Sequence, residues 1–261
     1  MKKFKIAQIV SVPHLEQIEN NHYHMCLAHL VGNTEYAKFY ERMSREGKFV
    51  LMDNGAAEGS QLTANELLKM YALINPTEIV LPDTLNNSLD TLRKTFNFIH
   101  EHKDLPYRFM GVPQGKDFAE WCMCAEAMLR EPRINTIGVS KFLNIATGND
   151  EIRVAAVAFL RKMAKLLDRE RDIEIHLLGC DEGPAIVNAI QELFPMVRGC
   201  DSAFAFIATQ AGMEITEDTE RPEGEIDFLE GTVLWEELPK RLREFENVTG
   251  VIDNTESLSW R

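Results

Sequence analysis

Residues 49–83, FVLMDNGAAEGSQLTANELLKMYALINPTEIVLPD, decide the fold. Two short apolar runs in this stretch, 49–53 and 78–82, have the length and composition of buried strands. Between them, residues 64–73 follow a helical pattern that ends at Asn75-Pro76, because a residue before proline disfavours the helical conformation. A strand, a helix and a second strand in this order predict a parallel β-α-β unit.

The same alternation continues on both sides of this stretch. Further strands are expected at 5–10, 25–31, 108–112, 135–139, 174–179 and 197–201. Further helices are expected at 35–45, 89–102, 118–129, 151–167 and 184–193. Eight strands in a chain of 261 residues predict an α/β fold, a zinc-free (β/α)8 TIM-type barrel. An open, doubly wound parallel sheet is the alternative.

The chain is expected to form one domain. Residues 1–261 contain no low-complexity linker and no internal repeat, so a single (β/α) barrel domain is predicted. The character of the sequence changes after residue 210. An acidic, loop-like stretch at 214–230 precedes a helical pattern at 235–246. Residues 210–261 are therefore expected to form a C-terminal acidic loop and a closing helix, packed on the outside of the barrel.

Composition and charge exclude several classes of protein. Hydrophobic residues make up 45% of the chain and charged residues 26%, as in globular domains. No apolar run is long enough for a membrane span, and the N-terminal MKKFKIAQIV is interpreted as a first strand rather than a signal peptide. The net charge of −13 disfavours a nucleic-acid partner, because phosphates are bound by Lys and Arg. Two local basic clusters are candidates nonetheless: Arg42, Arg45 and Lys48, and Lys240, Arg241 and Arg243.

The sequence predicts no bound metal or cofactor. The five cysteines, Cys26, Cys122, Cys124, Cys180 and Cys200, are scattered and form no C-x-x-C pair. We interpret them as reduced thiols of a cytoplasmic protein. Neither G-x-G-x-x-G nor G-x-x-x-x-G-K-[ST] occurs, so a dinucleotide or nucleoside-triphosphate site is not supported.

Three aspartates end apolar runs. They are Asp53 in FVLMDNG, Asp83 in IVLPD and Asp201 in RGCDS. An aspartate at a strand end is often only a turn former or a helix cap. In a barrel, however, these three would meet at the mouth, where the active sites of barrel enzymes lie. Carboxylates brought together acquire different pKa values, which suits them to separate acid, base and nucleophile roles.

Glycine follows or ends other strands. Examples are the segments 111–115, 138–140 and 178–180. Glycine at these places would let a flat ligand approach the backbone. The alternative is that these segments are only tight turns between strands and helices.

Taken in order, these strand ends resemble the tRNA-guanine transglycosylase superfamily. The resemblance extends over residues 49–203. The matching segments are Asp53-Asn54-Gly55-Ala56 for D-S-G-G, Asp83 for a base-binding aspartate, Gly111-Val112-Pro113-Gln114-Gly115 for G-V-x-Q-G, Ile137-Gly138-Val139 for I-G-G, Leu178-Gly179 for L-M-G, and Asp201 for the nucleophile.

The departures from this superfamily are specific. The zinc site is absent, residues 203–209 contain no basic residue, and Asn54-Gly55-Ala56 replaces the segment with paired glycines. In these respects the chain is most similar to the 7-deazaguanine DNA transglycosylases (DpdA type), especially the compact forms found in phages. That resemblance implies exchange of guanine in DNA for a free 7-deazaguanine base, in the cytoplasm of a host cell if the protein is phage-encoded.

The resemblance implies a role for each site residue. Asp201 is the expected nucleophile, which forms a covalent aspartyl-sugar intermediate, and Asp53 is the expected general acid and base. Asp83 is expected to bind the Watson–Crick edge of the purine. The remaining substrate-binding candidates are Asn54, Gly55, Gln114, Gly115, Gly138, Val139, Leu178 and Gly179.

Two other function classes stay open. The acidic charge favours an enzyme that exchanges or hydrolyses the base of a guanine nucleoside or nucleotide. A non-catalytic, transglycosylase-like binding subunit is the second class, although the presence of all three aspartates argues against it. An oligomer is possible with any of these functions, and no membrane partner is expected.

Overall fold

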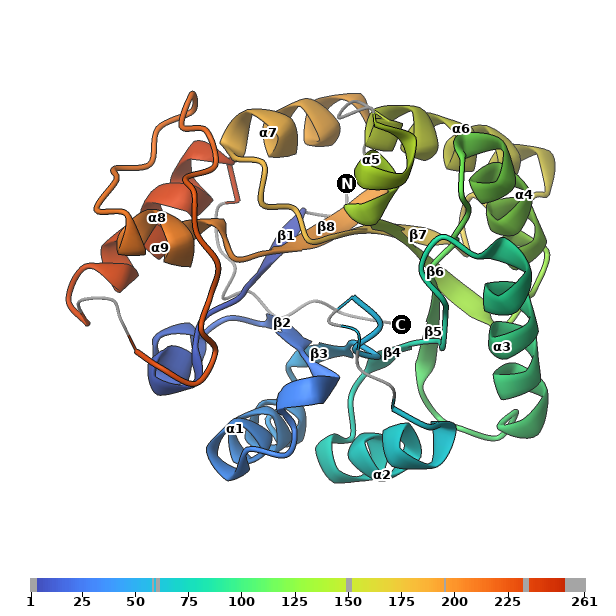
Figure 1. The fold of residues 1–261 in the computed structure, drawn as a ribbon, viewed down its shortest axis with the longest axis horizontal. Helices are drawn as coiled ribbons and strands as arrows, with labels where there is room; N and C mark the ends of the chain where they lie inside the picture. Colours follow the sequence, from blue (N-terminus) through green and yellow to red (C-terminus); the bar gives the residue numbers. More distant parts are fainter. Residues whose placement is uncertain are drawn as a thin grey trace.

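The computed structural model describes residues 4–57, 59, 62–148, 152–194, 196–231 and 235–251. In this part of the chain, eight parallel strands curl into a nearly closed barrel, and the helices form a layer outside it (Figure 1). The strands are β1 (Lys5–Gln8), β2 (Tyr23–Cys26), β3 (Phe49–Met52), β4 (Glu78–Val80), β5 (Arg108–Gly111), β6 (Ile134–Ser140), β7 (Glu174–Leu178) and β8 (Val197–Ser202).

The order of the strands confirms the predicted barrel and excludes the open doubly wound sheet. Hydrogen bonding runs in the order β1-β8-β7-β6-β5-β4-β3-β2, and every pairing is parallel. Because β1 pairs with β8, the first and last strands are neighbours, as barrel closure requires. β1 and β2 lie side by side at the seam, where the described residues form no hydrogen-bonded ladder.

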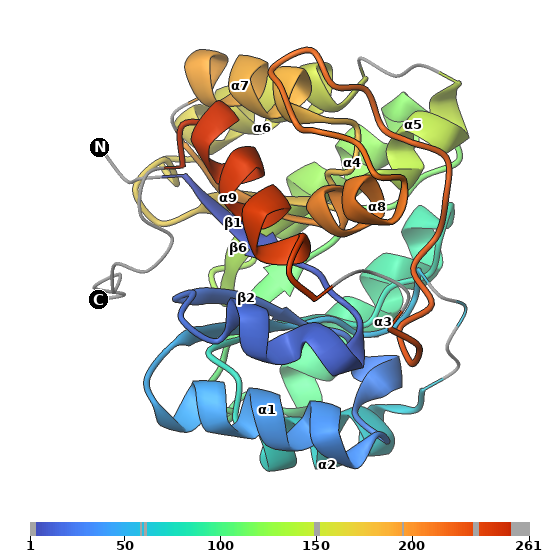
Figure 2. The same cartoon turned by 90° about the vertical axis from the view of Figure 1, so that its left-hand side faces the viewer.

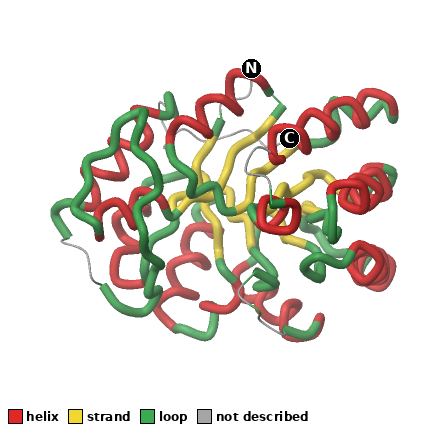
Figure 3. The backbone as a smooth tube through the Cα atoms, turned by 45° about the horizontal axis from the view of Figure 1, so that its top comes forward, coloured by secondary structure: helices red, strands yellow, loops and turns green. Residues whose placement is uncertain are grey.

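The helices surround the yellow strands of Figure 3. They are α1 (Thr34–Arg45), α2 (Ala64–Ile74), α3 (Ser88–Glu101), α4 (Phe118–Leu129), α5 (Phe142–Thr147), α6 (Ile152–Leu166), α7 (Pro184–Leu193), α8 (Phe204–Gln210) and α9 (Leu238–Val248). Two 3-10 segments, η1 (Val12–Ile18) and η2 (Ala28–Leu30), lie near β2 in the sequence. None of the described helices is both long and apolar enough to cross a bilayer.

The unit from β3 to β4 shows how local sequence places these elements. At the start of α2, the Thr63 hydroxyl accepts a hydrogen bond from the Glu66 backbone N–H (3.3 Å), and the Glu66 carboxylate accepts one from the Thr63 backbone (2.8 Å). This capping box satisfies N–H groups that the first turn leaves unpaired. Asn75 adopts a left-handed conformation, φ 53°, and ends the helix before the proline.

The second strand differs from its predicted position. The sequence predicts a strand at 25–31, but β2 ends at Cys26 and is followed by η2. The Leu27 N–H donates to the Tyr36 hydroxyl of α1 (2.7 Å), which turns the chain away from the sheet. His29, expected within this strand, therefore lies in η2, where its ring contacts Phe228 edge-on.

The C-terminal segment packs on the outside of the barrel over its described residues. Figure 2 shows α9 alongside α8, where the rings of Phe204 and Phe245 stack at 5.1 Å. α9 begins at Leu238, three residues later than the sequence indicates. The acidic stretch before it crosses to the N-terminal segment, where the Val12 N–H donates to the Phe228 carbonyl (2.8 Å). Residues 232–234 and 252–261 of this segment lie outside the described residues.

Candidate active site

A pocket opens where the carboxyl ends of the strands meet. It contains about 770 Å³ of empty space, part of which is open solvent. Asp53, Asp83 and Asp201 all line it, so the fold brings the three strand-end aspartates together. Four of the eight other substrate-binding candidates also line it: Asn54, Gln114, Leu178 and Gly179.

Asp53 and Asn54 directly follow β3 and turn the chain at the pocket wall. The Gly55 N–H donates to Asp53 Oδ2 (2.8 Å) and the Ala56 N–H donates to Asn54 Oδ1 (2.9 Å). Gly55 has φ 76°, a conformation that L side chains rarely adopt. The glycine at this position is therefore explained by the turn. Asp53 is half-buried and lines the pocket, whereas Gly55 itself does not.

Asp83 is held between two amide side chains. Asn54 Nδ2 donates to Asp83 Oδ1 (2.8 Å), and Gln114 Nε2 donates to Asp83 Oδ2 (2.6 Å). The amide oxygens of both residues accept backbone N–H groups, Ala56 for Asn54 and Asn86 for Gln114, so each NH₂ group is directed at the carboxylate. Burial raises the pKa of Asp83, and the two amide donors oppose that effect.

Asp201 lies in β8 and its carboxylate receives a donor on each oxygen. His176 Nε2 lies 3.0 Å from Asp201 Oδ1, and the Gly179 backbone N–H donates to Oδ2 (3.0 Å). Gly179 has φ 65° at the end of β7, so a glycine fits the turn that aims this N–H at the carboxylate. The side chain is buried apart from its edge on the pocket. These contacts fix the plane of the carboxylate.

The structure also brings residues into the site that the sequence reasoning missed. Asp181, two residues after Gly179, accepts the Ala203 N–H (2.7 Å) and pairs with Lys141 at 3.3 Å. Lys141 is the one basic side chain among the described residues that line this pocket. Asp181 also follows a strand, so the strand-end signal used for the other aspartates was available for it.

Arg153 is a second residue that sequence reasoning missed. Its buried guanidinium donates to the backbone carbonyls of Val139 and Leu178 (both 3.1 Å) and to Glu182 (2.8 Å). It therefore holds the ends of β6 and β7 in fixed relative positions beneath the pocket. A lone arginine at the start of a helical pattern carries no sequence signal for such a role.

Four of the predicted binding residues lie outside the pocket lining: Gly55, Gly115, Gly138 and Val139. β6 continues to Ser140, one residue further than expected, so Gly138 and Val139 lie inside the strand. A Cβ on Gly138 would meet Leu178, Met110 and Val112 within about 3 Å, so this glycine permits packing in the barrel. A Cβ on Gly115 would lie 2.4 Å from the Trp121 N, so Gly115 permits a tight turn against α4.

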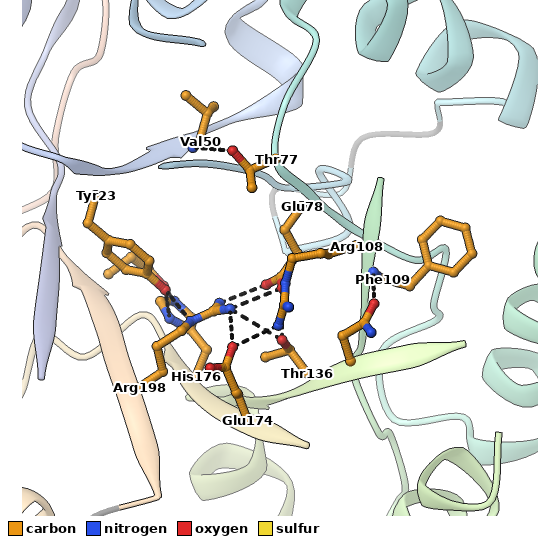
Figure 4. A network of polar contacts seen from close by, with 12 residues as sticks. Tyr23, Val50, Thr77, Glu78, Arg108, Phe109, Thr136, Glu174, His176 and Arg198 are labelled. Carbon is orange, nitrogen blue, oxygen red and sulfur yellow. Dashed lines mark hydrogen bonds and ion pairs between the residues drawn. The ribbon is translucent and has the colours of Figure 1, made fainter. Parts of the chain in front are cut away.

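Below the pocket, the barrel interior holds an ionic cluster that we call the core network (Figure 4). Its members are Glu78, Arg108, Thr136, Glu174 and Arg198. Arg198 donates to Glu78 (2.7 and 3.0 Å) and Glu174 (3.1 Å), and Arg108 donates to the same two carboxylates (3.0 and 2.7 Å). Two guanidinium groups thus neutralise two carboxylates. Burial opposes ionisation of Glu78, but the guanidinium groups outweigh it and lower its pKa to about 2.

Five of the six residues in the two basic clusters singled out in the sequence pair with acidic residues. In the first cluster, Arg42 pairs with Glu19 at 3.0 Å, and Arg45 and Lys48 lie within 3.7 Å of glutamates. In the second, Arg241 pairs with Glu244 at 2.7 Å. Neither cluster is thus a concentrated positive surface. Among the described residues, no group of three or more His, Cys, Asp or Glu side chains is arranged to hold a metal ion.

Comparisons with known proteins identify the fold and no family. No protein-family model and no curated protein sequence matches the chain. Among solved structures, the chain resembles the YdjI aldolase from Escherichia coli K12, with a TM-score of 0.57, 10% identity and coverage of 98% of this chain and 92% of that one. It also resembles the carboxyl transferase domain of Rhizobium etli pyruvate carboxylase, with a TM-score of 0.45, 12% identity and coverage of 100% and 50%. Neither is a guanine transglycosylase, and at this identity the likeness to the aldolase is one of fold alone.

Proposed function

We propose that the protein is a guanine transglycosylase that replaces guanine in DNA with a 7-deazaguanine base through a covalent aspartyl-sugar intermediate. The observation that carries this proposal is the convergence of Asp53, Asp83 and Asp201 on one pocket, in three different environments. Together with the ordered resemblance over residues 49–203, this gives each carboxylate a separate role.

Asp83 is suited to recognise the base. Its carboxylate is buried and oriented by Asn54 and Gln114, and its remaining lone pairs can accept the N1–H and 2-amino group of guanine. Apolar side chains of the pocket, including Leu85, Val112 and Phe228, can contact the faces of a flat purine. Such a site would reject adenine, which lacks the N1–H that Asp83 would accept.

Asp201 is suited to attack the sugar. Its carboxylate oxygen would form a bond to C1′ while the C1′–N9 bond breaks and its electron pair stays with the purine. Asp53, across the pocket, would supply a proton to the departing guanine. The N9 of the incoming 7-deazaguanine base would then attack C1′, release Asp201 and give up its N–H proton to Asp53. Two inversions at C1′ leave the configuration of the sugar unchanged, as in retaining glycosidases.

An enzyme of guanine nucleosides or nucleotides is the second candidate. The acid-paired basic clusters and the net charge of −13 favour it, because DNA binding relies on cations that neutralise phosphates. A single phosphate would need fewer cations than DNA, and Lys141, which pairs with Asp181, is the basic side chain at the pocket among the described residues. In either case the bond that is cleaved and the roles of the three aspartates are the same.

Base exchange measured on three substrates separates these candidates. Duplex DNA, tRNA and free deoxyguanosine, each labelled in guanine, would be incubated with enzyme and a 7-deazaguanine base. Released guanine and the base inserted in the product would then be identified by mass spectrometry. Exchange in DNA alone is the expected result. Exchange confined to deoxyguanosine would contradict the DNA substrate and support the second candidate. Release of guanine from none of the substrates would refute both.

A further inference from the structure

We infer that His176 is a positioning residue for Asp201, and that the direction of its hydrogen bond is set jointly by the Asp201 carboxylate and by Arg198 and Tyr23 inside the barrel. This role in catalysis rests on the proposed function. The hydrogen-bond direction itself does not, because it follows from the contacts of four buried side chains.

The chain of contacts begins at the core network. Arg198 Nε lies 2.9 Å from the Tyr23 hydroxyl, and a guanidinium nitrogen can only donate. The Tyr23 oxygen therefore accepts from Arg198. Glu78 and Glu174 hold the other nitrogens of the guanidinium, so Arg198 cannot turn its Nε–H elsewhere without breaking charged hydrogen bonds. Figure 4 shows Tyr23, His176 and Arg198 together on one side of this network.

The next two contacts have a fixed direction as well. The Tyr23 hydroxyl lies 2.8 Å from His176 Nδ1, and His176 Nε2 lies 3.0 Å from Asp201 Oδ1. A carboxylate accepts, so Nε2 must carry the imidazole proton. Nδ1 is then the acceptor for the Tyr23 O–H. Arg198 donates to Tyr23, Tyr23 to His176 and His176 to Asp201, so each of these three donors is matched with an acceptor.

The imidazole is neutral in this arrangement. Burial lowers the pKa of His176 more than the neighbouring Asp201 raises it, and the Arg198 guanidinium also disfavours a second positive charge. A neutral imidazole has one N–H, and the other nitrogen must be an acceptor. The Asp201 carboxylate and the Tyr23 O–H thus favour the same tautomer, the one in which Asp201 receives a donor. His176 is fully buried behind Asp201 and does not line the pocket, so it acts through Asp201 and not on substrate.

A pair of substitutions tests the positioning role. In His176→Gln, the amide nitrogen can take the place of Nε2 and still reach Asp201, whereas in His176→Asn the shorter side chain cannot. We expect His176→Asn to lower kcat for base exchange by about 10²-fold with little change in KM, since small misplacements of a reacting group have effects of that size. His176→Gln should recover most of the loss. Equal kcat in His176→Asn and the unchanged protein would overturn the role.

Nitrogen NMR tests the hydrogen-bond direction without any activity. In protein with ¹⁵N-labelled histidine, His176 should show a protonated Nε2 and an unprotonated Nδ1 at neutral pH. Tyr23→Phe removes the O–H that Nδ1 accepts, so it should weaken this preference. The matched control is Tyr40→Phe, in a buried tyrosine of α1 that has no described contact with His176. A protonated Nδ1 or an imidazolium in the unchanged protein would refute the inference. Correct tautomers without base exchange on any substrate would refute the proposed function alone.

Discussion

Replacing Glu78 with glutamine removes one of the two carboxylates that neutralise Arg198 and Arg108 in the barrel interior. Glu78 is fully buried and the side chain of Arg198 is 1% exposed, so solvent cannot compensate for the lost charge. Breaking a buried ion pair by removing one partner typically costs about 3–5 kcal/mol of unfolding free energy. The same contacts lower the pKa of Glu78 from 4.5 to about 2, a direction that agrees with this cost. We therefore expect Glu78→Gln to lower the free energy of unfolding by about 3–5 kcal/mol.

Urea unfolding followed by circular dichroism measures this loss, and thermal unfolding should show a melting temperature on the order of 10 °C lower. The matched control is Glu126→Gln, which removes an exposed partner of Arg130 and should cost less than about 1 kcal/mol. A loss below about 1 kcal/mol for Glu78→Gln would refute the reasoning that the core network is an ion-paired unit.

The pH dependence supplies a second check on Glu78. A carboxylate whose pKa is lowered by folding contributes stability that is fully present above its unfolded pKa. That contribution is lost as the pH falls from about 4.5 through about 2. The difference in stability between the unchanged protein and Glu78→Gln should therefore be constant near neutral pH and shrink in this acid range. A difference that grows on acidification would contradict the assignment.

Three further predictions concern the pocket. Asp201→Asn should form no covalent adduct with DNA, because the nucleophile is lost. Asp53→Asn should exchange bases about 10²–10⁴-fold more slowly and still trap some adduct. Gel electrophoresis and mass spectrometry of denatured mixtures would detect the adduct. An adduct mapped to Asp53 would reverse the two roles. Gln114→Leu deprives buried Asp83 of a donor and should raise KM for guanine-containing substrate about tenfold, and an unchanged KM would contradict base recognition at this carboxylate. Lys141→Met should weaken DNA binding and reduce its dependence on salt by about one phosphate contact, and an unchanged salt dependence would exclude that contact.

The fold could be predicted from sequence because its signals are local. The apolar runs, the capping residues before helices and the proline after α2 each act over a few residues, and their order predicts a parallel barrel. The predicted bounds of the second strand are wrong, because an apolar run at 25–31 does not show which of its residues pair with a neighbouring strand. That choice is made by the pairing of Tyr23 with Phe49 and by the Leu27 contact to Tyr36 of α1, both long-range or tertiary contacts.

Within the candidate site, the sequence could predict residues at the ends of strands but not the buried residues behind them. Asp53, Asp83 and Asp201 stand at strand ends, where topology alone brings them to the mouth of a barrel. His176 and Arg198 lie within strands, and their meeting depends on the register of the sheet. In that register His176 is opposite Gly199, next to Arg198, a relation that no local pattern in the sequence expresses. A charged residue inside an apolar strand is the one signal that could have directed attention to them.

The core network and the pocket are joined through one hydroxyl group, so stability and catalysis should be separable by experiment. Glu78→Gln disturbs Arg198 and, through Tyr23 and His176, the carboxylate of Asp201. Tyr23→Phe removes the hydroxyl that connects Arg198 to His176, and it leaves no charge unpaired. If the effect on kcat passes through Tyr23, Glu78→Gln should lower kcat in the unchanged protein but hardly further in Tyr23→Phe. Its effect on unfolding free energy should remain large in both, because the charge of Arg198 loses Glu78 as a partner whichever residue stands at position 23. Equal kcat losses in the two backgrounds would mean that Glu78 acts on the pocket by another route, such as a shift of β4 that moves Asp83.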